Sequence, residues 1–208
     1  MQTLGLDLVI DISAMAKLCF RYGAMNSGKT TALLQVAHNY EERGQRVVII
    51  KSAIDTKGND HVVSRLGVKR TADIVLTPEQ DLREALTDHF AAKAAPDNRI
   101  DCVLIDEAQF LSPAQVDQAL ATAVLDDIPV LAYGIRTDFQ TRSFPGSQRL
   151  MEIAHALEEM KTICRCGKKA IFNARLKDGA VVREGSQVMI DGDDAEYEAR
   201  CARCYLEG

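Results

Sequence analysis

The chain has 208 residues, of which 47% are hydrophobic and 26% are charged, and its formal net charge at pH 7 is -5. This composition is ordinary for a globular protein with one full core and a small accessory module. An acidic chain lacks the general electrostatic attraction to phosphate backbones, which argues against nucleic-acid binding. No apolar run reaches the ~18 residues of a membrane span. We therefore expect a cytoplasmic protein that acts on small molecules, with neither a membrane nor a nucleic acid as its partner.

Residues 1–15 do not resemble a secretion signal. The stretch contains Asp7 and Asp11 and has no basic residue before Lys17, whereas signal peptides begin with a positively charged region. We expect an N-terminal extension here that is either disordered or read from a misassigned start. Met15 is the alternative start, because it stands just before the first predicted strand.

Strands and helices alternate over residues 16–160. Apolar or β-branched runs predict four buried strands, which lie at 17–22, 46–50, 100–105 and 130–133. Apolar residues at helical spacing predict helices between and after them, the last one over 150–157. Two helix starts carry the capping-box pattern, at Thr77–Gln80 and Ser112–Gln115. This order predicts an α/β fold with a mostly parallel sheet and helices on both of its faces.

A phosphate-binding P-loop follows the first predicted strand. The pattern G-x-x-x-x-G-K-[ST] is matched in full by Gly23, Ala24, Met25, Asn26, Ser27, Gly28, Lys29 and Thr30. Glycines let the backbone wrap around a phosphate, and the following helix directs the positive end of its dipole at it. Lys29 is expected on the β- and γ-phosphates of ATP, and Thr30 on Mg²⁺. A glycine turn without function is the alternative, but the strand-loop-helix context favours a P-loop, RecA-like fold.

Two acidic residues end the strand predicted at 100–105. Asp106 stands at the strand tip, where P-loop proteins hold Mg²⁺, usually through water. Glu107 is one residue further and would face whatever approaches the γ-phosphate, so it can accept a proton from an attacking hydroxyl. We therefore take Glu107 and Lys29 as candidate catalytic residues. A solvated acidic pair at a strand end is the alternative.

Four of the six cysteines form two close pairs near the C-terminus: Cys164, Cys166, Cys201 and Cys204. The segment 161–208 is too short for a hydrophobic core of its own, so a bound metal ion is its natural staple. Four thiolates without a nearby histidine or acid indicate a closed structural site, for which zinc is the usual ion. We expect a zinc-ribbon domain over 161–208 that also closes the substrate site. Two disulfides or free buried thiols are the alternatives.

Several motifs together resemble the type II thymidine kinases. They are the P-loop, the run Asp106-Glu107-Ala108-Gln109-Phe110, Phe139-Gln140 with Phe144 following, and the paired cysteines. The similarity extends from about residue 16 to about residue 206, in the family's order. It implies a kinase domain over 16–160 that transfers the γ-phosphate of ATP to the 5′-hydroxyl of thymidine, and of deoxyuridine, to give dTMP. Glu107 matches the family's general base.

The same resemblance implies further site residues and partners. Gln109 and Asp55 are expected on the nucleotide side of the site, with Asp55 near Mg²⁺. The loop 135–146 suits a lid over a ligand. Members of the family are typically homotetramers that dTTP inhibits as the end product. By position, the nucleoside would be enclosed by Met25, Phe110, Phe139, Phe144, Ile190 and Tyr197.

Two other functions are compatible with parts of the sequence. Asp106–Gln109 also matches a helicase-like D-E-A-Q box, although the short chain and its acidic balance argue against a nucleic-acid motor. The second alternative is a nucleotide-binding regulator without catalytic activity, in which the cysteine segment binds a partner. DNA-stimulated ATPase activity would indicate the motor. ATP binding without turnover on any nucleoside would indicate the regulator.

Overall fold

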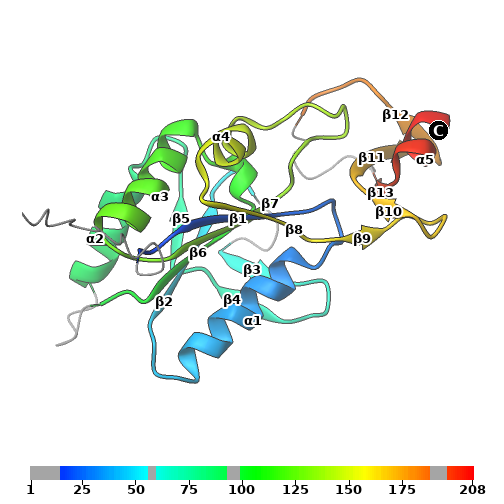
Figure 1. Cartoon of the computed structure of the whole chain (residues 1–208). Helices are drawn as coiled ribbons and strands as arrows, with labels where there is room; N and C mark the ends of the chain where they lie inside the picture. Colours follow the sequence, from blue (N-terminus) through cyan, green and yellow to red (C-terminus); the bar gives the residue numbers. More distant parts are fainter. Residues whose placement is uncertain (1–14, 56–59, 93–98, 188–195) are drawn as a thin grey trace, which may run out of the picture.

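A parallel sheet forms the centre of the computed structural model, which describes residues 15–55, 60–92, 99–187 and 196–208 (Figure 1). Its six strands follow the order β5-β2-β6-β7-β1-β8, and every neighbouring pair is parallel. The strands are β1 Leu18–Tyr22, β2 Val47–Ser52, β5 Ile74–Leu76, β6 Cys102–Asp106, β7 Val130–Gly134 and β8 Ala156–Glu159. The predicted parallel α/β class is confirmed.

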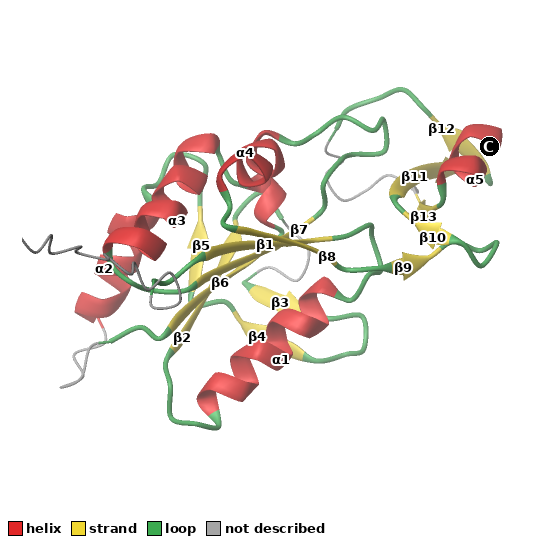
Figure 2. Cartoon of the chain, in the orientation of Figure 1, coloured by secondary structure: helices red, strands yellow, loops and turns green. Residues whose placement is uncertain are grey.

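Helices cover both faces of this sheet (Figure 2). One face carries α1 (Lys29–Glu41), with the hairpin of β3 (His61–Val63) and β4 (Lys69–Thr71) close to it. The other face carries α2 (Leu82–Ala92), α3 (Pro113–Leu125) and α4 (Pro145–Ile153). Within the described part of the chain, none of the helices has the length and apolarity that a membrane crossing requires.

The central strands are apolar throughout because each face of the sheet is buried under helices. In β2, Val48 and Ile50 join the core beneath α2, α3 and α4, whereas Val47 and Ile49 join the core beneath α1. Successive side chains of a strand point to opposite faces, so a sheet covered on both sides leaves no position for a polar residue. Charged residues of these strands therefore lie at or next to the C-terminal ends, as Arg21, Lys51 and Asp106 do.

The two predicted capping boxes have different outcomes. Ser112 is the N-cap of α3: its Oγ accepts the Gln115 N–H at 3.2 Å, and Gln115 Oε1 accepts the Ser112 N–H at 3.0 Å. The segment Thr77–Gln80 forms a turn instead of a helix start. Asp81 caps α2 in its place, because its carboxylate accepts two N–H groups at the start of that helix. The prediction of a helix start at Thr77 is therefore wrong by one turn.

The helix predicted over 150–157 is also displaced. α4 begins at Pro145 and ends at Ile153, and the chain then turns into extended backbone at Ala154 (φ -66°, ψ 139°). Leu157 lies in β8, where it pairs with Phe20 of β1 and is 48% exposed. Leu150, Ile153 and Leu157 have the spacing of one helix face, although Leu157 belongs to a strand. The error arises because an edge strand has apolar residues at only some positions, so it lacks the continuous apolar run of a buried strand.

The chain beyond β8 forms what we call the C-terminal module, which lies past the C-terminal ends of the central strands (Figure 1). It contains a two-stranded sheet, a three-stranded sheet in the order β12-β11-β13, and a short helix. Its elements are β9 Thr162–Ile163, β10 Lys169–Ala170, β11 Phe172–Lys177, β12 Ala180–Val182, β13 Glu196–Arg200 and α5 Ala202–Glu207. Neither β13 nor α5 was expected from the sequence.

We predict that Ser112→Ala lowers the free energy of unfolding by about 1 kcal/mol, because the N-cap oxygen of α3 is lost. Urea denaturation of the two proteins measures the difference. Ser112→Asp is the matched control, since its carboxylate restores an acceptor and should leave stability near that of the wild type. Equal stability of the alanine variant and the wild type would contradict this role of Ser112.

Candidate functional site

The P-loop joins β1 to α1 at the C-terminal edge of the sheet. Asn26 and Gly28 both adopt left-handed backbone, with φ of 65° and 79°. Gly23 has no room for a side chain, since a Cβ there would lie 2.4 Å from the Met160 carbonyl oxygen and 2.5 Å from Ser27 Oγ. Among the described residues no side chain caps α1, so the N-terminal end of its dipole is directed at the loop. The loop is therefore shaped to receive an anion.

The side chain of Lys29 folds back over the P-loop. Its Nζ donates to the carbonyl oxygens of Gly23 at 3.4 Å and Ala24 at 3.2 Å, and the residue is 7% exposed. Burial lowers the pKa of this ammonium, while the charges of Glu107 and Asp106 act in the opposite direction. The cation is thus held at the mouth of the loop, where a phosphate oxygen can replace the carbonyls as its partner.

Asp106, the last residue of β6, faces the first turn of α1. Thr30 Oγ1 lies 3.4 Å from Asp106 Oδ1 and 3.5 Å from Oδ2, and Asp106 is 4% exposed. Burial raises the pKa of the Asp106 carboxyl to about 7, and the nearby charges of Glu107 and Asp55 add to the effect. A threonine hydroxyl and a strand-end carboxylate are the groups with which P-loop proteins hold Mg²⁺.

Asp55 belongs to the same charged group. Its Oδ2 pairs with Lys51 Nζ at 3.1 Å, and the same Nζ donates to the His61 carbonyl oxygen at 3.2 Å. Lys51 is the register partner of Asp106 in the sheet and is 1% exposed. The structure thus adds a second buried cation to this edge of the sheet. Lys51 was not predicted as a site residue because it directly follows the ordinary apolar run 46–50.

Glu107 begins the short 3₁₀ turn Ala108–Phe110 with a left-handed φ of 47°. This backbone is costly for a residue with a side chain, so its surroundings must hold it. Gln109 Nε2 donates to Glu107 Oε2 at 2.5 Å, and Gln109 Oε1 accepts the Ile135 N–H at 3.1 Å. The Gln109 side chain fits here only because residue 134 is glycine, since a Cβ on Gly134 would lie 2.8 Å from Gln109 Oε1. Gln109 therefore fixes the orientation of the Glu107 carboxylate.

The aromatic residues predicted to enclose a nucleoside form two groups. Phe110 and Phe144 meet edge to face, with ring centroids 5.8 Å apart and planes at 84°. Phe139 and Tyr197 both contact the guanidinium of Arg175, whose Cζ lies 3.6 Å from the first ring centroid and 5.3 Å from the second. Phe139 is almost fully buried and Tyr197 is half-buried. The two groups come from three separate segments of the chain.

Met25 connects the P-loop to the C-terminal module. Its N–H donates to Asn173 Oδ1 at 2.7 Å, and Asn173 Nδ2 donates to the Thr137 carbonyl oxygen at 3.0 Å. Asn173 is 3% exposed, so this bridge is buried. β11 thereby joins the P-loop to the loop 135–146. Ile190, which is also predicted to contact the nucleoside, lies outside the described residues.

Side chains of the C-terminal module hold the loop 135–146 in place. Tyr205 Oη donates to the Phe139 carbonyl oxygen at 2.7 Å, and Gln187 Nε2 donates to Asp138 Oδ2 at 3.1 Å. The loop predicted as a lid is therefore fastened to the module by its backbone and by its side chains. Tyr205 and Gln187 were not predicted as site residues, because their partners are distant in the chain.

The four cysteine sulfurs converge at one point of the C-terminal module. They lie within 4.8 Å of one another and belong to Cys164, Cys166, Cys201 and Cys204. All are free thiols, and the contact of 3.6 Å between Cys166 Sγ and Cys201 Sγ joins the two sequence pairs. Four converging thiols can hold a metal ion, as the sequence analysis predicted.

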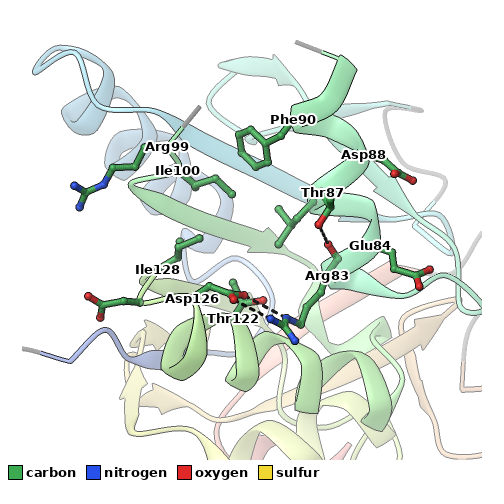
Figure 3. Close-up of a pocket in the computed structure, with 12 residues that line it drawn as sticks. Arg83, Glu84, Thr87, Asp88, Phe90, Arg99, Ile100, Thr122, Asp126 and Ile128 are labelled. Atoms are coloured by element: carbon green, nitrogen blue, oxygen red, sulfur yellow. Dashed lines mark hydrogen bonds and ion pairs between the residues drawn. The ribbon is translucent and has the colours of Figure 1, made fainter. Parts of the chain in front are cut away.

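A hollow of about 890 Å³ lies at the opposite edge of the sheet, between α2 and α3 (Figure 3). Ile100 and Ile128, which precede β6 and β7, form part of its wall, and the ion pair of Arg83 and Asp126 at 2.8 Å is in its lining. Ligands of open parallel sheets bind beyond the C-terminal ends of the strands. This hollow is therefore separate from the phosphate site.

The parallel sheet, the P-loop at its edge and the acid at the tip of β6 together define a nucleotide-binding protein of the P-loop class. The family model described as thymidine kinase matches residues 16–205. Among curated relatives, the thymidine kinase of Idiomarina loihiensis is 48% identical over 195 residues, which cover 93% of this chain and 97% of the relative. That of Enterobacteria phage T4 is 46% identical over 195 residues, with the same coverage.

The chain belongs to the thymidine kinase family. This confirms the resemblance and the enzyme class inferred from the sequence, and it favours an enzyme over the motor and regulator alternatives. Among solved structures, the replication initiator DnaA bound to AMPPCP and single-stranded DNA is 18% identical, with a TM-score of 0.40 over 73% of this chain and 42% of that chain. A similarity this weak says nothing about function.

We predict that ionisation of Asp106 destabilises the protein when Mg²⁺ and nucleotide are absent. The pKa of its carboxyl is about 7 in the folded chain, against an ordinary value of 3.8. The folded state therefore binds the proton more tightly than the unfolded state does, so stability falls as the pH rises from about 4 to about 7. At pH 8 Asp106→Asn should be more stable than the wild type, by on the order of 2 kcal/mol.

Urea denaturation at pH 5 and pH 8 measures this effect, and the advantage of Asp106→Asn should shrink at the lower pH. Asp88→Asn, on the exposed surface of α2, is the control and should show no such difference. An advantage of Asp106→Asn that is absent, or equal at both pH values, would contradict the prediction.

We predict that the purified protein carries about one metal ion per chain, bound by the four cysteines. Cys201→Ser should lose most of the metal and some thermal stability, because one of the four thiolates is removed. Cys19→Ser changes a thiol outside the cluster and should retain the metal. Elemental analysis and thermal denaturation test both variants, and equal metal content in the two would exclude the cluster as the metal site.

Proposed function

We propose that the chain transfers the γ-phosphate of ATP to the 5′-hydroxyl of thymidine, and of deoxyuridine, with Glu107 as the general base. The observation that carries this proposal is the position of the Glu107 carboxylate, which Gln109 holds beside the charged groups of the P-loop. The names of the relatives, all thymidine kinases, support thymidine as the acceptor. Deoxyuridine differs by one methyl group, which is worth only ~1–3 kcal/mol of discrimination.

The P-loop would bind the phosphates of ATP. Its N–H groups and the dipole of α1 attract the anion, and Lys29 exchanges the carbonyl oxygens of Gly23 and Ala24 for β- and γ-phosphate oxygens. Thr30 and Asp106 would hold Mg²⁺, with Asp55 close to them. The ion, when bound, neutralises the charge that develops on the transferring phosphoryl group.

Glu107 would take the proton of the 5′-hydroxyl as its oxygen attacks the γ-phosphorus. The O–H bond breaks, the new P–O bond forms, and the bond between the γ-phosphorus and the bridging oxygen breaks to release ADP. In the described part of the chain Gln109 alone hydrogen-bonds to the side chain of Glu107, and it does so at Oε2. Oε1 therefore remains available to the substrate hydroxyl. Correct orientation of such a base raises the rate without strengthening ground-state binding.

The nucleoside would be enclosed by the aromatic and thioether groups at the same end of the molecule. Flat pyrimidine rings bind well against aromatic faces and methionine sulfur. Phe139 and Phe144 belong to the loop 135–146, which the C-terminal module fastens down. We assign the enclosure to Met25, Phe110, Phe139, Phe144, Ile190 and Tyr197.

The remaining features of the proposal concern ions, partners and organisation. We propose zinc as the ion of the cysteine cluster, because a closed set of four thiolates is its usual structural site. Free thiols are maintained in reducing compartments, which supports a cytoplasmic location. The proposed feedback inhibitor, dTTP, combines a thymine ring with a triphosphate that suits a P-loop. Division into 16–160 and 161–208, and assembly as a homotetramer, follow from the resemblance to the family.

We predict phosphate transfer from ATP to thymidine and deoxyuridine, and little or none to deoxyadenosine, deoxyguanosine or deoxycytidine. Glu107→Gln should lower kcat by about 10²–10⁴-fold, because the general base is lost, while ATP binding persists. Glu84→Gln, on the exposed surface of α2, is the matched control and should leave kcat unchanged. Full activity in Glu107→Gln would exclude Glu107 as the base, and no turnover on any nucleoside would exclude the proposed reaction.

A further inference from the structure

Arg175, on β11, is a buried cation without an anionic partner among the described residues. It is 4% exposed, and no carboxylate of the described segments lies within ion-pair distance of it. Burial of an unpaired charge is unfavourable unless other groups replace its hydration. The neighbours that replace water around this guanidinium therefore indicate what the residue is for.

Three groups surround the guanidinium. Its Cζ lies 3.6 Å from the centroid of the Phe139 ring, a distance at which the planar cation stacks on the ring face. Its Nε donates to Tyr197 Oη at 2.8 Å, and its Nη2 donates to the Ser186 carbonyl oxygen at 2.9 Å. The backbone approaches so closely that a Cβ on Gly185 would lie 3.1 Å from Nη1.

These contacts come from three different parts of the chain. Phe139 belongs to the loop 135–146, Tyr197 belongs to β13, and Ser186 precedes the segment that the structure does not describe. A guanidinium has five N–H donors in one rigid plane, so it fixes its neighbours relative to one another in direction as well as distance. Lysine has neither the plane nor the fork.

We propose that Arg175 is a positioning residue for the nucleoside, which sets the separation and tilt of the Phe139 and Tyr197 rings. The inference rests on the proposed function, in which these two rings help to enclose the base. In the described part of the chain, the ring contacts and hydrogen bonds of the Arg175 side chain are with Phe139, Tyr197 and Ser186, and not with the P-loop. Arg175 should therefore determine the affinity for thymidine and leave phosphoryl transfer unaffected.

Other residues hold the backbone of the loop without help from Arg175. Tyr205 Oη binds the Phe139 carbonyl oxygen at 2.7 Å, and Asn173 Nδ2 binds the Thr137 carbonyl oxygen at 3.0 Å. Loss of the guanidinium would free the Phe139 ring and the Tyr197 hydroxyl but would leave the loop attached. Because the loop stays attached, an effect of Arg175 on the position of the rings can be distinguished from an effect on folding.

The test compares Arg175→Met with Arg46→Met in steady-state kinetics and in calorimetric titration with thymidine. Arg46 provides a matched control because its guanidinium also lies over an aromatic ring, 5.6 Å from the centroid of Phe90, which lines the hollow at the opposite edge of the sheet. Arg175→Met should raise the KM and Kd for thymidine about tenfold. The KM for ATP, kcat and the metal content should stay near wild-type values. Arg46→Met should leave the thymidine KM unchanged.

Two further variants test the rigid fork itself. Arg175→Lys keeps the charge but should recover only a small part of the affinity, because it lacks the stacking plane. Tyr197→Phe keeps the ring and should raise the thymidine KM about threefold through loss of one hydrogen bond to a charged group. In the Arg175→Met background the same change should have no further effect, since the hydroxyl has already lost its partner.

Two results would overturn the inference. One is a thymidine Kd in Arg175→Met equal to that in Arg46→Met. The other is a fall in kcat together with a rise in both KM values and loss of metal, which would indicate damage to the fold. If the wild type failed to phosphorylate thymidine, the proposed function would fall on its own, and the titrations would still decide whether Arg175 governs thymidine binding.

Discussion

The charged site depends on one constraint, the burial of both faces of the parallel sheet. Strands covered on both sides admit only apolar residues along their length, so the polar groups collect where the strands end together. Lys29, Asp106 and Lys51 are all less than 10% exposed there, and the burial of each charge is tolerated because the others are near. Two acids are adjacent in sequence, and the lysine of the P-loop offsets part of their repulsion.

The second determinant of the site is β11, which lies in the C-terminal module but directs polar side chains at the P-loop and at the loop 135–146. Asn173 and Arg175 occupy alternate positions of this strand, so both point to the same side of its sheet. One contacts the P-loop and the other contacts the loop 135–146. The cysteine cluster fixes the chain on either side of β11 and β13. The cysteine cluster is thereby linked, through one strand, to the P-loop and to the loop 135–146.

Much of this could be predicted from the sequence, for identifiable physical reasons. β1, β2, β6 and β7 are continuous apolar runs, and the P-loop has few alternatives in its strand-loop-helix context. β8 was missed because its sequence Ala-Leu-Glu-Glu reflects an exposed edge, and the turn at Thr77 was mistaken for a helix start because Asp81 caps more effectively. Asn173 and Arg175 gave no signal. Polar residues that alternate with apolar ones normally face solvent, and here only the tertiary structure turns that face inward.

The hydrogen bond from Met25 to Asn173 spans 148 residues of sequence. Contacts so distant in sequence form late, and domains fold in the order in which they leave the ribosome. The sheet and the P-loop precede β11 in the chain, so a nascent chain can build its phosphate site long before the last quarter is synthesised. The contacts of Asn173 with the P-loop and of Tyr197 with Arg175 cannot form until β11 and then β13 emerge. An unfinished polypeptide would thus carry a folded P-loop before the strands that hold the loop 135–146 in place exist.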